Sequence, residues 1–264
     1  MSLTFNSPTV SLIWQRNLDH LTKSFLLLLF LLLLALPPAM AFYPLNVRYN
    51  TRDVSRSKNP SGRMANVRPG VGPDGRPGGS FRFKGRSDSY IEFPNKGRLD
   101  ARNSISILAW INPDGPVGPI FNYKPDGFGV HLWMVRRRVL LVRFVTRARK
   151  FTAAVQTNLI KPKAWNFVTA TYNQRTGYAR LYIDYREVAR KRIGRIRLAT
   201  NYPARMGARI GDKRYFRGRI TCLQIYDVPL RPIQIQLAKR LCLKTSKDNE
   251  LRVVYKSDTS TKLI

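Results

Sequence analysis

Alternation of apolar and polar residues starts at Ser80 and recurs in short runs. Phe81 and Phe83 flank Arg82, and Ser104–Ile111 is a longer apolar run with small polar partners. A period of two predicts strands with one buried face. Many short strands separated by turns predict an all-β protein built as a sandwich of two antiparallel sheets. The other candidate strands are Tyr90–Phe93, Pro119–Tyr123, Phe128–Val135, Val139–Val145, Phe151–Val155, Trp165–Tyr172, Ala179–Ile183, Ala208–Ile210 and Arg219–Tyr226.

Turn and helix signals separate these runs. Asn173–Gly177 (NQRTG) predicts a hairpin loop between two candidate strands. One segment, Pro229–Leu241, has a helical pattern, because Ile233, Leu237 and Leu241 lie four residues apart. It predicts a short C-terminal helix. Three Pro-Asp-Gly sequences predict turns rather than metal ligands: Pro73–Gly75, Pro113–Gly115 and Pro125–Gly127.

The N-terminus has the pattern of a secretory leader. Ser24–Leu36 is strongly apolar, and two prolines and Ala39-Met40-Ala41 follow it. This order is typical of the hydrophobic region and cleavage site of a signal peptide, so we expect removal after Ala41 and secretion. The alternative is a retained signal anchor in a single-pass membrane protein. Four basic residues just after the leader would resist export of that flank: Arg48, Arg52, Arg56 and Lys58.

The remaining segments differ in composition. Residues 42–79 are dense in Arg, Ser, Asn, Pro and Gly and lack an apolar period, which predicts a flexible basic linker. Residues 80–242 form the expected folded domain. Residues 243–264 are polar and predict a frayed tail, in which Leu251–Tyr255 is a candidate edge strand. The leader, residues 1–41, completes this division of the chain.

Four stretches carry a family resemblance. They are DSYIEF at 88–93, SISILAWINP at 104–113, WNFVTATYNQRTGYARLYID at 165–184 and RIGDKRYFRGRITCLQIYDVPLRPIQI at 209–235. Together they resemble the laminin-G-like domains of the concanavalin A-like lectin/glucanase superfamily, to which pentraxins also belong. The resemblance covers Phe81–Cys242 and implies a jelly-roll sandwich with a lectin-like binding role.

The same resemblance has implications for cysteines and metals. Family members often close a disulfide near the positions of Cys222 and Cys242, and an exported pair is expected to be oxidised. Laminin-G-like domains and pentraxins often bind calcium through acidic and carbonyl oxygens. Because no Asp or Glu occurs from Gly127 to Ile183, calcium remains an implication of the resemblance alone. We assign no metal ligand and no other cofactor.

Catalysis is not expected, although the superfamily includes glycoside hydrolases. That chemistry needs two carboxylates with different protonation states. The E-x-D-x-x-E signature is absent, and Asp184 and Glu187 are the one tight carboxylate pair, beside several arginines that would keep both ionised. His131 is the one histidine of the domain and lies between Val130 and Leu132, as a packed strand residue would. We therefore predict a non-enzyme.

The net charge of +32 indicates the chemistry of the binding partner. Residues 80–242 carry 33 basic and nine acidic residues, and 24 of the basic ones are arginines. The planar guanidinium matches sulfate, phosphate and carboxylate in a bidentate manner, so the partner should be anionic. Arg143, Arg147 and Arg149 share parity and would form a row on one strand face. The full set of candidate ligand-binding residues is Arg136, Arg137, Arg138, Arg143, Arg147, Arg149, Arg190, Lys191 and Arg192, with a further basic group at 205–219.

Compartment and charge together point to one class of partner. Outside the cell the abundant polyanions are sulfated glycosaminoglycans and other anionic polysaccharides, so a lectin-like module that binds sulfated glycans is the leading hypothesis. The alternative is an adhesion or matrix module that binds acidic extracellular proteins. A third hypothesis is that the basic charge serves solubility alone. Nucleic acid does not fit a leader and a fold of this kind, and membrane attachment requires a retained leader.

Overall fold

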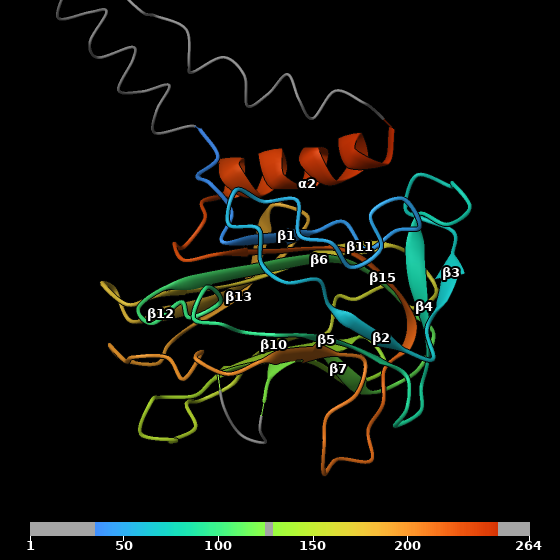
Figure 1. Ribbon diagram of the computed structural model, residues 1–264. Coiled ribbons are helices and arrows are strands. Elements are labelled where there is room, and N and C mark those ends of the chain that lie inside the picture. The colour runs from blue at the N-terminus through green and yellow to red at the C-terminus, as the bar shows by residue number, and fades with distance from the viewer. Residues whose placement is uncertain (1–34, 125–128, 248–264) are drawn as a thin grey trace, which may run out of the picture. The chain divides into compact units, whose positions relative to one another are not determined.

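Two antiparallel sheets and a helix make up the computed structural model, which describes residues 35–124 and 129–247. The helix, α2 (Pro232–Lys247), lies along the outer face of the first sheet, and the second sheet lies on the other side of that sheet (Figure 1). The predicted all-β sandwich of two antiparallel sheets with a C-terminal helix is confirmed.

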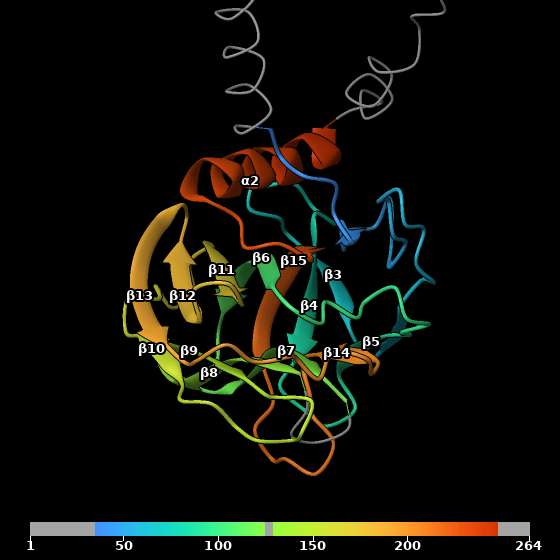
Figure 2. The same ribbon diagram turned by 90° about the vertical axis from the view of Figure 1, so that its left-hand side faces the viewer.

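The first sheet contains eight strands in the described part of the chain, and seven of them follow one another from edge to edge (Figure 2). The eighth, β1 (Ala41–Tyr43), pairs with β15 beside this path. The order across the sheet is β13 (Arg186–Arg192), β12 (Tyr178–Ile183), β11 (Asn166–Asn173), β6 (Ile105–Pro113), β15 (Arg217–Tyr226), β4 (Ser80–Lys84) and β3 (Arg68–Gly70).

The second sheet contains seven strands and packs against the first. Side chains alternate between the core and the outside: Leu140 and Val142 of β9 are fully buried, as are Ile107 and Ile111 on β6 of the facing sheet. The intervening residues therefore point away from the core on both sheets. The strand order is β10 (Val155–Thr157), β9 (Val139–Phe144), β8 (Val130–Arg136), β7 (Gly118–Tyr123), β14 (Ala204–Met206), β5 (Tyr90–Phe93) and β2 (Arg63–Ala65).

Helix α2 begins later and ends later than its apolar period predicted. Pro232 occupies the first turn, where its missing N–H costs nothing. The side chain of Gln234 reaches back and accepts a hydrogen bond from the backbone N–H of Arg231 at 3.0 Å, which caps the helix. Gln224 of β15 donates through Nε2 to the carbonyl of Ala238 at 3.0 Å. The helix thus covers the middle of the first sheet.

A disulfide fastens the helix to the sheet. Cys222 and Cys242 are bonded, which confirms the pairing that the resemblance implied. Cys222 lies where the register between β15 and β6 shifts, and its φ of 57° marks a bulge. A bulge re-aims one side chain of a strand. Here the bulge lies at Cys222, whose disulfide joins β15 to the helix packed on the outer face of the first sheet.

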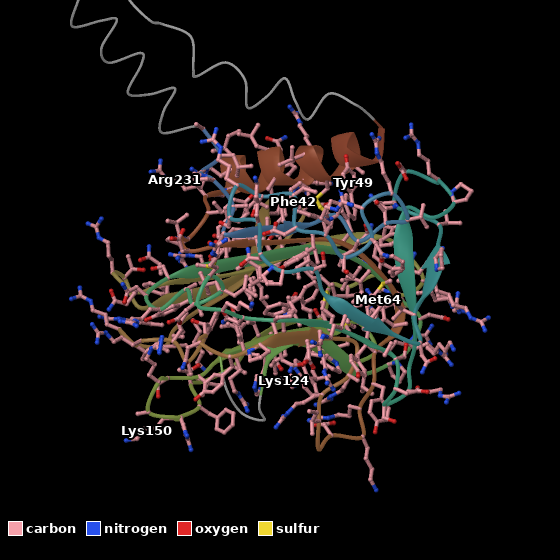
Figure 3. The ribbon with its side chains drawn as sticks, viewed as in Figure 1. Phe42, Tyr49, Met64, Lys124, Lys150 and Arg231 are labelled. Atoms are coloured by element: carbon pink, nitrogen blue, oxygen red, sulfur yellow. A yellow bond between two sulfur atoms is a disulfide. The ribbon has the colours of Figure 1, made fainter. Side chains whose placement is uncertain are left out.

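The prediction of a flexible linker at residues 42–79 is wrong. This segment contributes most of β1 and all of β2 and β3, which pair with β15, β5 and β4. Phe42 is 3% exposed and lies between α2 and the first sheet (Figure 3). The folded unit extends back to Pro37, so the predicted cleavage boundary after Ala41 falls inside β1.

Side-chain hydrogen bonds, rather than an apolar period, hold this segment in place. The carboxylate of Asp53 is 6% exposed and accepts five hydrogen bonds. The donors are the backbone N–H groups of Phe42 (2.8 Å), Ser55 (2.9 Å) and Asn59 (2.7 Å), Ser55 Oγ (2.9 Å) and Asn59 Nδ2 (2.6 Å). Sequence periodicity does not detect such a network, because its members are local polar residues that also favour turns.

Other boundaries need smaller corrections. The strand predicted at Ala208–Ile210 lies earlier, at β14, because Gly207 at φ 88° turns the chain. The strand predicted at Phe151–Val155 lies later, at β10 (Val155–Thr157), and shares only Val155 with the prediction. Most of the leader, the Pro125–Gly127 turn and the candidate strand Leu251–Tyr255 lie outside the described residues. Within those residues, the structure contains no helix with both the length and the apolar character needed to cross a bilayer.

Candidate anion-binding site

The candidate residues from sequence do not converge on one surface. Arg136 ends β8, and Arg137 and Arg138 lie exposed in the turn that leads to β9, at one end of the second sheet. Arg190, Lys191 and Arg192 lie on β13, the edge strand of the first sheet. Glu187 already pairs with Arg190 at 3.7 Å and with Arg180 at 3.2 Å.

The predicted row of Arg143, Arg147 and Arg149 is wrong, because β9 ends at Phe144. Only Arg143 is in the strand. Arg147 forms an ion pair with Asp100, and Arg149 lies in the following turn at φ 62°. Strand parity therefore does not apply beyond Phe144, and ligand binding by this set remains a prediction without a shared surface to support it.

Three arginines from distant parts of the chain do meet on the outer face of the first sheet. Arg68 on β3 lies directly opposite Arg82 on β4, and Arg82 lies opposite Arg219 on β15. We call these three residues the arginine ladder. Directly opposed residues of neighbouring antiparallel strands place their Cβ atoms about 4.5–5.5 Å apart, and like charges there are destabilising.

A pocket of about 270 Å³ adjoins the arginine ladder. Arg82, Lys163 and Arg219 line it together with Asn112, Asp114 and Gly218. The guanidinium of Arg219 also lies 5.5 Å from the ring centre of Trp165, which fixes its direction and supplies an apolar surface beside the charge.

Among the described residues, one carboxylate forms ion pairs with this cluster. Asp114 pairs with Arg82 at 3.2 Å and more loosely with Arg217 at 3.9 Å. Lys84 stands opposite Arg217 on the next rung, so a second pair of like charges lies beside the arginine ladder. The cations outnumber the anions, and a bound anion would relieve the repulsion.

The sequence contained only part of the signal for this site. Alternation with Phe81 and Phe83 showed that Arg82 points outward. Arg68 lay in the supposed linker, and the pairing of β3 with β4 and of β4 with β15 is long-range. No sequence pattern predicted that these three residues share a surface.

On the outer face of the second sheet, the two central cations, Lys124 and Arg205, share one carboxylate, Glu92. Glu92 accepts hydrogen bonds from Lys124 Nζ (2.7 Å) and Arg205 Nε (2.9 Å), and Arg205 stacks 4.0 Å from the ring centre of Tyr90. Figure 3 shows Lys124 on the side of the domain away from α2. Partial burial alone would raise the pKa of Glu92, but the hydrogen bonds and charges of Lys124 and Arg205 outweigh it and hold the pKa below its usual value.

We expect this cluster to contribute a pH-dependent share of stability. A carboxyl with a lowered folded pKa stabilises the protein above its unfolded pKa, and the contribution is lost as pH falls through the folded pKa. Glu92→Gln should lower the free energy of unfolding by about 1 kcal/mol at pH 7. The difference from wild type should shrink as the pH falls below 4.5 and through the lowered folded pKa of Glu92. Urea unfolding across this range measures it, and a difference independent of pH would contradict the ion-pair origin.

Both members of the tight carboxylate pair predicted from the sequence, Asp184 and Glu187, form ion pairs. Asp184 pairs with Lys239 of α2 at 2.6 Å, whereas Glu187 pairs with Arg180, so the one tight carboxylate pair of the sequence faces two different cations. In the described parts of the chain, no group of three or more His, Cys, Asp or Glu side chains is placed to hold a metal ion.

Comparison with known proteins identifies the fold. A laminin-G-like family model described as the concanavalin A-like lectin/glucanases superfamily matches residues 84–236. Similar solved structures include the binding domain of Paraclostridial Mosquitocidal Protein 1 (17% identity, TM-score 0.63, 80% of this chain and 53% of that chain). The botulinum neurotoxin serotype G binding domain is also similar (14%, 0.62, 79% and 51%).

A third similar structure is the ligand binding domain of botulinum neurotoxin serotype D in complex with N-acetylneuraminic acid (16%, 0.60, 77% and 50%). The chain thus spans about half the length of these structures, and identities this low establish the fold only. A search of curated proteins gives no match. The jelly-roll fold predicted from the resemblance is confirmed. Since the family model covers more than half of its residues, the chain belongs to the concanavalin A-like lectin/glucanase superfamily.

Proposed function

We propose that the protein is a secreted, non-enzymatic binding module that recognises sulfated linear glycans through the arginine ladder. The observation that carries this proposal is the direct opposition of Arg68, Arg82 and Arg219 on three neighbouring strands. Secretion rests on the leader predicted at residues 1–41, and the N-terminal mass of protein recovered from culture medium tests it.

The chemistry of the cluster favours sulfate groups on an extended chain. Strands lie about 4.8 Å apart, so the three guanidinium groups offer a series of forks across about 10 Å of sheet. Each can form paired, charge-assisted hydrogen bonds with a sulfate. Lys163 adds a further cation, and Trp165 adds a half-buried ring against which a sugar face can pack. A polymer with regularly spaced sulfates uses all of these groups, whereas one small anion uses few.

Heparin affinity tests this proposal. The double variant Arg82→Ala/Arg219→Ala should bind at least about 100-fold more weakly at constant salt, because each of the two arginines loses one or more charge-assisted hydrogen bonds of about 1.5–3 kcal/mol. It should also elute from immobilised heparin at lower salt and with a shallower salt dependence, since fewer counterions are released. Surface plasmon resonance at two salt concentrations measures both quantities.

The matched control removes the same charge elsewhere. Arg175→Ala/Arg231→Ala replaces two exposed arginines, one in the β11–β12 loop and one just before α2. We expect it to change affinity less than threefold. An equal loss in both double variants would mean that net charge alone governs binding. A loss confined to Arg137→Ala/Arg138→Ala would move the site to the β8–β9 turn, and a partner that survives glycosaminoglycan digestion would favour an acidic protein instead.

A further inference from the structure

A second pocket lies on the opposite side of the sandwich from the arginine ladder. It has a volume of about 210 Å³. The residues that matter for its chemistry are Trp133, Leu141, Arg143, Phe151, Arg209 and Arg214, and we call it the Trp133 pocket. Its neighbours on the same sheet, Lys124 and Arg205, are already paired with Glu92.

The second sheet and one loop build this pocket. Trp133 on β8 lies opposite Leu141 on β9, and His131 lies opposite Arg143, all on the face that points away from the core. The loop from β14 to β15, coloured orange in Figure 1, extends beyond the sheet and supplies Arg209 and Arg214. Backbone hydrogen bonds fix the base of the loop: Gly207 donates to Pro119 at 3.0 Å, and Phe216 donates to Gly207 at 2.8 Å.

The two loop arginines have different electrostatic surroundings. The guanidinium of Arg214 lies 4.6 Å from the Trp133 ring centre and is hydrogen-bonded to Asp212 at 2.6 and 3.0 Å. That hydrogen bonding, reinforced by the charge of Arg209, lowers the pKa of Asp212, so Asp212 is ionised at neutral pH and offsets the charge of Arg214. Arg209, 5.8 Å from the same ring centre, and Arg143 leave the pocket with a net positive charge.

Two buried donors at the pocket have no hydrogen-bond partner among the described residues. One is Nε1 of Trp133, a side chain that is 3% exposed, and the other is Nε of Arg143. A buried donor without a partner costs about 1–3 kcal/mol. Beside these donors the pocket has an apolar surface: the Phe151 ring is 56% exposed, and its centre lies 5.8 Å from the Arg143 guanidinium.

We propose that the Trp133 pocket binds a single pyranose ring that bears a carboxylate. The carboxylate accepts hydrogen bonds from the Arg143 guanidinium, and the apolar face of the sugar packs on Phe151 and Leu141, beside the Trp133 ring. The pocket is smaller than the ~300–1,000 Å³ typical of drug-sized ligands, which suits one sugar residue. This site does not depend on the arginine ladder, and the two can fail separately.

Titration of the full chain with D-glucuronate, D-glucose and sodium sulfate tests the assignment. Glucuronate should shift the indole N–H resonance of Trp133, assigned with Trp133→Phe, and should bind at least tenfold more tightly than glucose. Sulfate at equal ionic strength should not displace it, because it lacks the ring. Absence of glucuronate binding at millimolar concentration, or equal binding of glucose, would overturn the proposal.

Variants place the binding in the pocket. Arg143→Gln should weaken glucuronate binding at least tenfold, and Phe151→Ala severalfold, while both retain the wild-type unfolding midpoint within a few degrees. The control Arg175→Gln should leave glucuronate binding unchanged. If Arg143→Gln binds glucuronate as wild type does, the site is elsewhere. Heparin affinity of the same variants separates the two sites: loss of glucuronate binding with heparin affinity intact supports the pocket whatever the outcome for the arginine ladder.

Discussion

Gly118→Ala is expected to lower the free energy of unfolding by about 3–5 kcal/mol, since overpacking and backbone strain act together. Gly118 begins β7 at φ 131°, a conformation that side chains disfavour. A Cβ there would lie 2.1 Å from the backbone nitrogen of Phe216 and 2.3 Å from the carbonyl carbon of Tyr215. Backbone atoms cannot rotate aside, so the strand or the loop that carries Arg209 must move.

A second glycine provides the control for this prediction. Gly75 also has positive φ, at 80°, but a Cβ there would meet no atom within 4 Å. Gly75→Ala should therefore cost only about 1 kcal/mol, from backbone strain. Urea unfolding of both variants gives the comparison. Equal destabilisation would show that φ, and not the close approach of the two chain segments, explains why glycine occupies position 118.

Asp53→Ala is expected to cost about 3 kcal/mol, because it removes one acceptor that satisfies five donors in a buried site. Three of those donors are backbone N–H groups, and they cannot turn toward water without unfolding the segment. Hydrogen exchange should accelerate at Phe42, Ser55 and Asn59, and trypsin should cut near Arg52 and Arg56. The exposed carboxylate Asp227 offers a control, since Asp227→Ala should have little effect.

The outcome for Asp53 shows what holds residues 42–79 in place. If the variant unfolds at the wild-type urea concentration and keeps slow exchange at Phe42, the Asp53 network does not stabilise the segment. If exchange accelerates as expected, the network is what holds the segment against the two sheets to which it contributes strands. This matters for binding, because Arg68 belongs to the segment.

Most of the fold was predictable because its signals are local. Alternation of apolar residues identified the strands that became β4, β6, β11 and β15, and the closing stretch from Arg209 to Ile235 carried the family resemblance. The errors have local causes as well. Short edge strands such as β2 and β3 have too few residues for a period to register, and the Asp53 network uses residue types that otherwise favour turns.

The basic surface was predictable only in sign and chemistry. The predicted ligand-binding residues were basic clusters adjacent in sequence. In the structure, however, Arg147 is paired with Asp100 and Arg190 with Glu187. The residues that do converge, Arg68, Arg82 and Arg219, come from separate strands. Contiguous charges on a loop spread outward into solvent, whereas charges on paired strands face one another at the spacing of the sheet.

The sequence by itself determined that the chain forms a β-sandwich with an arginine-rich surface, because alternation and composition are properties of short segments, and the resemblance of four stretches implied the laminin-G-like kind. Only the tertiary structure decided which of the basic residues share a surface. The register between β3, β4 and β15 and the position of the β14–β15 loop depend on long-range pairing, and a slip of one residue would turn each arginine to the other face.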